Sequence, residues 1–179
     1  MSRVRIVGGA WRSRLLEVAR VPGLRPTPDR VRETLFNWLG QDLSGLNCLD
    51  LFAGTGILGF EAASRGAARV TLVEHDARAF AALRQAAMTL QAAQVEVIRG
   101  DAVRFAQASP DRFDVVFLDP PYSQGWLERV EPFLDRLLKP GGWLYAESES
   151  PVACLGAWQT TRHGRAGKVH FHLLQGRQE

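Results

Sequence analysis

The chain has very little cysteine and no long apolar segment. Its 179 residues include only Cys48 and Cys154, too few for a disulfide framework, and we expect both thiols to be reduced, as in the cytoplasm. No run reaches 18 apolar residues, so the sequence predicts no transmembrane helix. The first residues, Met1–Arg5, lack the apolar stretch of a signal peptide. No cluster of His and Cys has the spacing of metal ligands, so we expect no metal. These absences favour a cytoplasmic globular protein.

Lysine is also scarce, and the charge that is present is unevenly distributed. Twenty of the 22 basic residues are Arg, whose side chain suits bidentate phosphate contacts. Residues 1–34 carry eight Arg against three acidic residues, and residues 151–179 carry four basic residues against one acidic residue. Residues 35–150 carry ten basic and fifteen acidic residues. Basic ends around an acidic centre indicate a nucleic-acid surface beside a separate cofactor site, and the alternative is ordinary solvated surface.

The N-terminal part of the chain predicts a short hairpin followed by a helix. Residues 4–7 and 15–18 have the pattern of two strands joined by a glycine-rich, basic turn. After an irregular linker, an apolar face repeats at helical spacing over residues 30–39. Thr27 or Asp29 is placed to cap this helix.

From residue 46 onwards, strand patterns alternate with helix patterns. The expected helices include 76–91 and 124–138, the second ending at Lys139–Gly142. This alternation predicts an α/β fold with a mostly parallel sheet covered on both faces. The last two strands have no helix between them, so we expect a hairpin in which one strand runs antiparallel. The expected strands are 47–52, 69–74, 95–98, 113–118, 142–147, about 157–162 and 168–174.

A glycine-rich turn follows the first strand of this series. Gly54-x-Gly56-x-x-Gly59 lets the backbone approach a ligand and matches the dinucleotide fingerprint, with Glu74 about 20 residues later. A nicotinamide-dependent oxidoreductase is therefore one alternative. Asp50 argues against it, because a carboxylate just before a phosphate-binding turn repels pyrophosphate. The same carboxylate suits a cofactor with an ammonium group, such as the methionine part of S-adenosylmethionine.

Acidic residues end three successive strands of the predicted sheet. Asp50 ends the first, Glu74 the second, and Asp101 follows the third. Glu74 can accept hydrogen bonds from both hydroxyls of a cofactor ribose, and Asp101 can accept one from an adenine amine. Each residue alone could be a helix cap or a turn residue. The three together indicate a ligand at the carboxyl edge of the sheet.

Asp119-Pro120-Pro121-Tyr122 follows a strand that is predicted to be buried, 113–118. The two prolines stiffen the loop and remove two backbone donors. The loop therefore presents a carboxylate, bare carbonyls and an aromatic ring. Asp119 and the Pro120 carbonyl can accept the two hydrogens of an exocyclic amine while Tyr122 stacks on the base. This arrangement would aim the amine's lone pair at a methyl donor for direct displacement, with no metal.

With these motifs the sequence resembles the S-adenosylmethionine-dependent amino-methyltransferases, and among them the bacterial 16S ribosomal RNA guanine-N2 methyltransferases of the RsmD type. The resemblance covers essentially the whole chain, including Arg5–Gly9, Arg25–Leu39 and the C-terminal hairpin with Lys168. It implies a Rossmann-like methyltransferase fold: a mostly parallel seven-stranded sheet with an antiparallel C-terminal strand, plus a small N-terminal β-hairpin. The expected domains are a basic hairpin extension, 1–24, and a methyltransferase domain, 25–179.

The resemblance implies transfer of a methyl group from S-adenosylmethionine to the N2 amine of a specific guanine in 16S ribosomal RNA. The partner would be the small ribosomal subunit or an assembly intermediate, and we expect a monomer. The expected catalytic residues are Asp119, Pro120 and Tyr122. The expected cofactor-binding residues are Thr27, Asp50, Phe52, Gly54, Gly56, Glu74, Asp101 and Ala102. The candidates for RNA contact are Arg3, Arg5, Arg12, Arg14, Arg25 and Lys168.

Three other functions stay open at this point. The proline loop recognises an amine and not a particular base, so adenine N6 is an alternative target. A protein glutamine amide is another, although such enzymes usually have Asn where this chain has Asp119. The third is a non-catalytic RNA-binding assembly factor.

Overall fold

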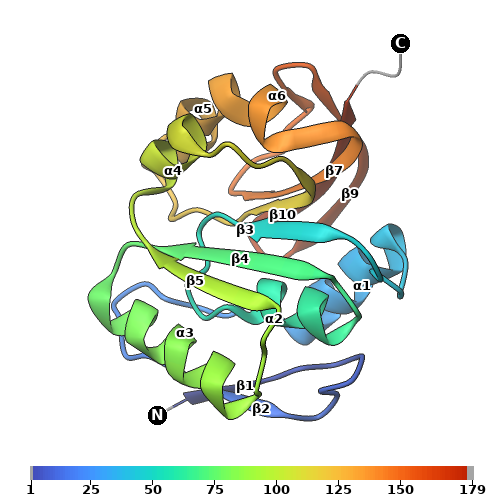
Figure 1. The fold of residues 1–179 in the computed structure, drawn as a ribbon. Helices are drawn as coiled ribbons and strands as arrows, with labels where there is room; N and C mark the ends of the chain where they lie inside the picture. The colour runs from blue at the N-terminus through green and yellow to red at the C-terminus, as the bar shows by residue number, and fades with distance from the viewer. Residues whose placement is uncertain (1, 177–179) are drawn as a thin grey trace.

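An eight-stranded sheet runs through the molecule, and a separate two-stranded hairpin packs against the helices α2 (Ile57–Ser64) and α3 (Ala77–Thr89) on one side of it (Figure 1). The computed structural model describes residues 2–176. The sheet order is β5-β4-β3-β6-β7-β10-β9-β8, in which β3 to β7 are parallel and β10 is antiparallel to β7. The hairpin pairs β1 with β2. The strands are β1 Ser2–Arg5, β2 Leu15–Val18, β3 Asn47–Asp50, β4 Arg69–Glu74, β5 Val95–Arg99, β6 Phe113–Leu118, β7 Leu138–Ser148, β8 Cys154–Leu155, β9 Trp158–Ala166 and β10 Val169–Gly176.

Helices cover both faces of this sheet (Figure 1). The residues of β6 show why: Val115 and Phe117 pack into one apolar cluster, and Val116 and Leu118 into the other. A strand buried on both faces appears in the sequence as a continuous apolar run. The helices are α1 Asp29–Leu39, α2 Ile57–Ser64 and α3 Ala77–Thr89 on one side, and α4 Ala102–Ala108, α5 Trp126–Val130, the 3₁₀ helix η1 Glu131–Phe133 and α6 Leu134–Leu137 on the other. Within residues 2–176, no helix has the length and apolar character needed to cross a membrane.

The expected alternation of strands and helices is confirmed, with three differences of detail. The single helix expected over 124–138 is broken into α5, η1 and α6, because Pro132 lies where a continuous helix would need a backbone N–H. β7 begins at Leu138, so Lys139–Gly142 is a register irregularity inside the strand and not a stop before it. The short strand β8 was not expected, and it adds an eighth strand at one edge.

The strand order places a topological switch point between β3 and β6. β4 and β5 extend the sheet on one side of β3, and β6 and β7 extend it on the other. In open α/β sheets, ligands bind in the crevice outside the carboxyl ends of the strands at such a point. Asp50 ends β3 and Asp119 follows β6, so both residues lie at this point of the sheet edge, which we call the crevice.

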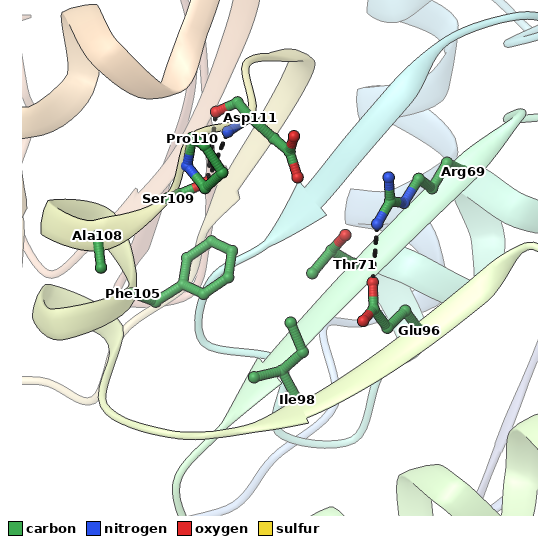
Figure 2. A pocket seen from close by; sticks show the side chains of 9 residues that line it. All are labelled: Arg69, Thr71, Glu96, Ile98, Phe105, Ala108, Ser109, Pro110 and Asp111. Carbon is green, nitrogen blue, oxygen red and sulfur yellow. Dashed lines mark hydrogen bonds and ion pairs between the residues drawn. The ribbon is translucent and has the colours of Figure 1, made fainter.

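A different pocket opens at the opposite end of the sheet (Figure 2). It is lined by Arg69 and Thr71 of β4, Glu96 of β5 and Phe105 of α4, among others. Arg69 and Glu96 form an ion pair across the two strands, with 3.0 Å between nitrogen and oxygen. Because Arg69 begins the strand that Glu74 ends, this pocket is separate from the crevice at the carboxyl edge.

The N-terminal hairpin is fastened to the end of α2. The backbone nitrogens of Ala10 and Trp11 donate to the carbonyl and hydroxyl oxygens of Ser64, at 2.7 and 2.9 Å. The Ser64 hydroxyl donates in turn to the Gly8 carbonyl at 2.6 Å. Gly9 has φ of +79°, and a Cβ there would lie 2.0 Å from the Ser64 carbonyl oxygen. The contact therefore requires glycine.

A buried ion pair also links the hairpin to α1 and α2. Arg32 Nη1 lies 2.7 Å from Glu61 Oε1, and both side chains are fully buried. Arg32 also donates to the Arg5 carbonyl at 2.7 Å, and Glu61 accepts from the backbone nitrogen of Val7 at 2.5 Å. Arg65 donates to the other oxygen of Glu61 at 3.3 Å. Such a pair is expensive to break, because the surviving partner would be a buried, unpaired charge.

We expect Gly9→Ala to destabilise the protein far more than the matched control Gly45→Ala. Gly45 has a similar φ of +81° but no atom within 4 Å of an added Cβ. In both variants, alanine at a positive φ costs about 1–2 kcal/mol of backbone strain. Gly9→Ala adds overpacking and should lower the free energy of unfolding by about 2 kcal/mol more, measured by urea denaturation. Equal losses in the two variants would contradict the close contact at Ser64.

Candidate active site

Asp50 lies beneath the glycine-rich turn at the end of β3. It is buried, and its Oδ2 accepts a hydrogen bond from the backbone nitrogen of Gly59 at 3.2 Å. Its Oδ1 is buried and has no partner among the residues that the structure describes. Burial raises the pKa of Asp50 to about 7, and the negative charges of Glu74 and Glu147 contribute to the rise. A buried carboxyl oxygen without a partner is costly, so this position favours a ligand that brings a donor or a positive charge.

The glycine-rich turn is narrow and presents bare backbone. Gly54 and Gly56 have φ of +55° and +81°, which favours glycine at both positions. A Cβ on Gly56 would lie 2.4 Å from Leu83 and 2.7 Å from Phe60. A Cβ on Gly54 would lie 2.9 Å from Leu24, so the linker after the hairpin passes over the turn. The turn can thus hold a ligand against its backbone while the linker covers it.

Glu74 is fixed beside the same turn. Its Oε2 accepts a hydrogen bond from the backbone nitrogen of Gly54 at 2.7 Å. Its Oε1 accepts hydrogen bonds from the next two backbone nitrogens along the chain, at 3.1 and 3.0 Å. These contacts hold the carboxylate at the carboxyl end of β4, facing the turn.

Asp101 and Phe52 complete this side of the crevice. Asp101 caps α4, with Oδ1 accepting from the backbone nitrogen of Arg104 at 3.0 Å, so the cap engages only one of its oxygens. Ala102 follows it as the first, buried residue of α4. The Phe52 ring packs edge-on against Trp126 at 5.5 Å between centroids. Because Trp126 begins α5 directly after the proline loop, this contact joins the loop to the glycine-rich turn.

The proline loop leaves β6 with its polar groups at the crevice and its aromatic ring outside. Asp119 is partly buried, Pro120 is buried and Tyr122 is 43% exposed. Ser123 and Gly125, with φ of +63° and +66°, turn the chain into α5. An exposed ring beside a carboxylate can stack on a flat partner whose amine reaches that carboxylate.

Thr27 lies at the candidate site and does not cap a helix. The expected capping role is wrong for both Thr27 and Asp29: the N-cap position of α1 is Pro28, with no side-chain cap. The buried Thr27 hydroxyl instead lies 3.3 Å from Asp119 Oδ2 and 3.1 Å from Glu147 Oε1. The segment before α1 is thereby fixed to the ends of β6 and β7.

Tyr145 and Glu147 also lie at the candidate site, and the sequence analysis missed both. Glu147 is buried near the end of β7, and its Oε1 accepts a hydrogen bond from the Tyr145 hydroxyl at 2.6 Å. The sequence pattern of this segment indicates only a buried strand. The usable signal was a glutamate and a tyrosine, two residues apart, in an otherwise apolar strand adjacent to the one that Asp119 follows.

The crevice concentrates acidic groups. Burial and the adjacent Glu147 raise the pKa of Asp119 well above its ordinary value. Burial and the same glutamate raise the pKa of Tyr145 well above the ordinary value for tyrosine, and burial raises that of Tyr122 to about 12. Such a crevice favours a cationic ligand.

The six candidate RNA-contact residues are all exposed but are spread over the molecule. Arg12 and Arg14 lie on the hairpin tip, beside the C-terminal end of α2. Lys168 lies in the β9–β10 turn, beyond the carboxyl end of β7, because His170 pairs with Ser148. Arg25 lies in the linker, close enough to favour the ionised form of Tyr122. The structure therefore brings Arg25 and Lys168, but not the hairpin tip, to the side of the crevice.

Comparison with known proteins assigns the chain to a family. The family model described as Conserved hypothetical protein 95 matches residues 4–175. Ribosomal RNA small subunit methyltransferase D of Escherichia coli (strain K12) is 42% identical over 182 residues, covering 97% of this chain and 90% of that protein. The solved structure of yhhF from Escherichia coli is 41% identical with a TM-score of 0.88, covering 99% of this chain and 100% of that one.

A more distant structure shows the same fold. The RNA methyltransferase of Salinibacter ruber, solved in complex with S-adenosyl-L-homocysteine, has 21% identity and a TM-score of 0.66, and the match covers 87% of this chain and 96% of that one. The expected Rossmann-like methyltransferase fold is thereby confirmed. On the full-length match at 42% identity, the chain belongs to the ribosomal RNA small subunit methyltransferase D family.

Proposed function

We propose that this protein transfers a methyl group from S-adenosylmethionine to the exocyclic N2 amine of a guanine in 16S ribosomal RNA. The observation that carries the proposal is the position of Asp119, at the end of β6 and next to the strand that leads into the glycine-rich turn. A methyl donor on the turn and an amine on the proline loop would then face each other across the switch point. The name of the Escherichia coli relative supports the small-subunit RNA as substrate. The choice of guanine N2 rests on the resemblance of the motifs.

The crevice fits S-adenosylmethionine, which supplies a methyl group activated by its sulfonium. The unpaired Oδ1 of Asp50 matches the ammonium of the methionine part. The fixed carboxylate of Glu74 suits the ribose hydroxyls, and the oxygen of Asp101 that is free of the helix cap suits the adenine amine. The other proposed cofactor-binding residues are Thr27, Phe52, Gly54, Gly56 and Ala102.

The chain's own residues act by positioning the base. Asp119 and the carbonyl of Pro120 accept the two hydrogens of the amine, which favours a tetrahedral nitrogen and directs its lone pair toward the methyl group. Tyr122, exposed at the mouth of the crevice, stacks on the base once it has left its own stack. The negative groups of the crevice stabilise the positive charge that develops on the nitrogen.

Basic residues beside the crevice and on the hairpin account for RNA binding in this proposal. The hairpin extension, 1–24, would contact RNA phosphates through Arg3, Arg5, Arg12 and Arg14, while the domain over 25–179 carries the chemistry. Arg25 and Lys168 would contact phosphates next to the target base. We propose a monomer that binds the small subunit or an assembly intermediate of it.

The experiment that tests this function is methyl transfer from labelled S-adenosylmethionine to small ribosomal subunits that lack the modification, followed by digestion to nucleosides. We expect label in N2-methylguanosine. Asp119→Ala should lower kcat by at least about 100-fold, because the amine loses an aligned acceptor. Asp111→Ala, at the other end of β6, is the matched control. Label in N6-methyladenosine or in protein would show that the substrate is not guanine N2. No transfer despite cofactor binding would favour a non-catalytic RNA-binding protein.

Asp50→Asn should weaken S-adenosylmethionine binding by about 10-fold or more, measured by calorimetry, because the ammonium loses a buried counter-charge. The same change should flatten the dependence of stability on pH. The folded pKa of Asp50, about 7, lies above the usual 3.8, so the wild type loses stability as pH rises toward and through 7. Each pKa unit corresponds to about 1.4 kcal/mol. Asp111→Asn is the control, and a melting temperature with the same pH dependence in both variants would contradict this role.

Replacing Arg3, Arg5, Arg12 and Arg14 together with Gln should weaken binding to the small subunit and reduce its salt dependence. For each phosphate that is no longer neutralised, the slope of log K against log salt should fall by roughly 0.7–0.9. The matched control replaces four exposed arginines elsewhere: Arg84, Arg104, Arg112 and Arg136. Filter binding over a range of salt concentrations is the measurement. An unchanged slope in the first set would show that the hairpin is not part of the RNA-binding surface.

A further inference from the structure

Two carboxyl groups meet at the point where the target amine would be held. In the parallel pairing of β6 with β7, Leu118 lies opposite Ala146, so Asp119 and Glu147 are the next pair along the two strands. Both carboxyl groups lie within hydrogen-bonding distance of the same Thr27 hydroxyl. Glu147 is buried and Asp119 is partly buried, so little water is available to separate the two charges.

The groups around Asp119 and Glu147 donate too few hydrogen bonds to stabilise two ionised carboxylates. Thr27 has one hydroxyl hydrogen, yet its oxygen lies 3.3 Å from Asp119 Oδ2 and 3.1 Å from Glu147 Oε1. The Tyr145 hydroxyl donates to Glu147 at 2.6 Å. Within residues 2–176, neither carboxyl group has a Lys, Arg or His nitrogen within ion-pair distance.

The other charged and titratable groups around the pair are mostly acidic. Asp50 adds negative charge from β3, and Tyr122 lies near Asp119, Glu147 and Glu149. Arg25, in the linker, brings positive charge near this group of residues, at Tyr122. Two ionised carboxylates side by side would therefore have little positive charge near them to offset their mutual repulsion.

We propose that Asp119 and Glu147 share a single proton in the resting protein, with the proton on Asp119 and the negative charge on Glu147. The donors explain this distribution. Glu147 faces two hydroxyl donors, from Tyr145 and Thr27, which stabilise its ionised form. Protonated Asp119 then donates its own hydrogen to Glu147. The direction of the pKa shift of Asp119, raised by burial and by the charge of Glu147, agrees with this arrangement.

The pair has a consequence for the reaction, which rests on the proposed function. A protonated Asp119 presents a carbonyl oxygen to the amine, as the side chain of Asn would. When the bond from nitrogen to the methyl carbon forms, the bond from sulfur to that carbon breaks and its electron pair stays on sulfur. The nitrogen must then lose a proton. That proton passes to the carbonyl oxygen of Asp119, and the original proton of Asp119 moves to Glu147. Glu147 is thus the final proton acceptor within the site.

Infrared difference spectroscopy on the free protein tests the shared proton without any substrate. Protonated carboxyl groups have a C=O stretch that carboxylates lack. Because the charge of Glu147 also acts on Asp50, the comparison is made in the Asp50→Asn background, which removes this second raised carboxyl. In that background at pH 7, Asp119→Asn and Glu147→Gln are compared with the parent.

We expect both changes to remove one protonated-carboxyl band. Asp119→Asn removes the acid itself, and Glu147→Gln removes the neighbouring charge, so that Asp119 ionises. If both groups are ionised in the parent, neither change alters the acid band and the proposal is overturned. If Glu147→Gln does not fold, the presence or absence of the band in Asp119→Asn still decides the question.

Activity of the Asp119 variants tests the role of the pair in the reaction. With the native Asp50 restored, we expect Asp119→Asn to lose less activity than Asp119→Ala. An amide offers the amine the same carbonyl oxygen but cannot pass a proton to Glu147, so kcat should fall by about 10-fold in Asp119→Asn, against at least about 100-fold in Asp119→Ala. An equal loss in both would show that a carboxylate is needed and would overturn the protonated state in the complex. Inactivity of the wild type on every small-subunit substrate would refute the proposed function while leaving the infrared result to decide on the shared proton.

Discussion

The parallel register of four strands is the constraint on which the rest of the site depends. Because β4, β3, β6 and β7 lie side by side and end at one edge, Glu74, Asp50, Asp119 and Glu147 are brought into one row. Four acidic side chains in a partly buried row repel one another. The protein compensates them in different ways: Glu74 accepts three backbone N–H groups, Asp50 accepts one, and Glu147 accepts two hydroxyls. The Oδ1 of Asp50, which has no hydrogen-bond partner among the described residues, suits a positively charged cofactor.

The linker between the hairpin and α1 connects this row to the rest of the chain. Thr27 contacts the ends of β6 and β7 through its hydroxyl, and its carbonyl accepts a hydrogen bond from Arg32 at 2.9 Å. The same guanidinium binds Glu61 of α2 and the Arg5 carbonyl of the hairpin. A single buried side chain therefore sets the position of the linker relative to the hairpin and to α2. Leu24, in the same linker, lies against Gly54.

Much of the fold and part of the site could be predicted from the sequence, and the limits have physical reasons. The continuous apolar run of β6 and the glycines at positive φ are local signals, so the parallel sheet and the turn were expected. The break at Pro132 was also visible in the sequence, but the apolar stripe on both sides of it predicted one helix. Thr27 was given a capping role because local spacing allows it, whereas its partners are more than 90 residues away in the chain. Glu147 was missed because its importance comes from the register of β7 against β6, which no local pattern specifies. The assignment of individual site residues to cofactor, base or RNA stays a prediction.

Because the hairpin is attached to Ser64 at the end of α2, the distance between the hairpin tip and the glycine-rich turn is fixed. The glycine-rich turn lies at the start of α2 and the hairpin tip at its end, and a helix of eight residues is about 12 Å long. Because α2 is rigid, the distance between the reacting centre and the basic tip is set by this helix and not by a flexible linker. Under the proposed function, the protein would measure a fixed footprint on its RNA. Only a folded RNA surface that places a phosphate at that distance from an accessible guanine would satisfy both ends of α2 at once.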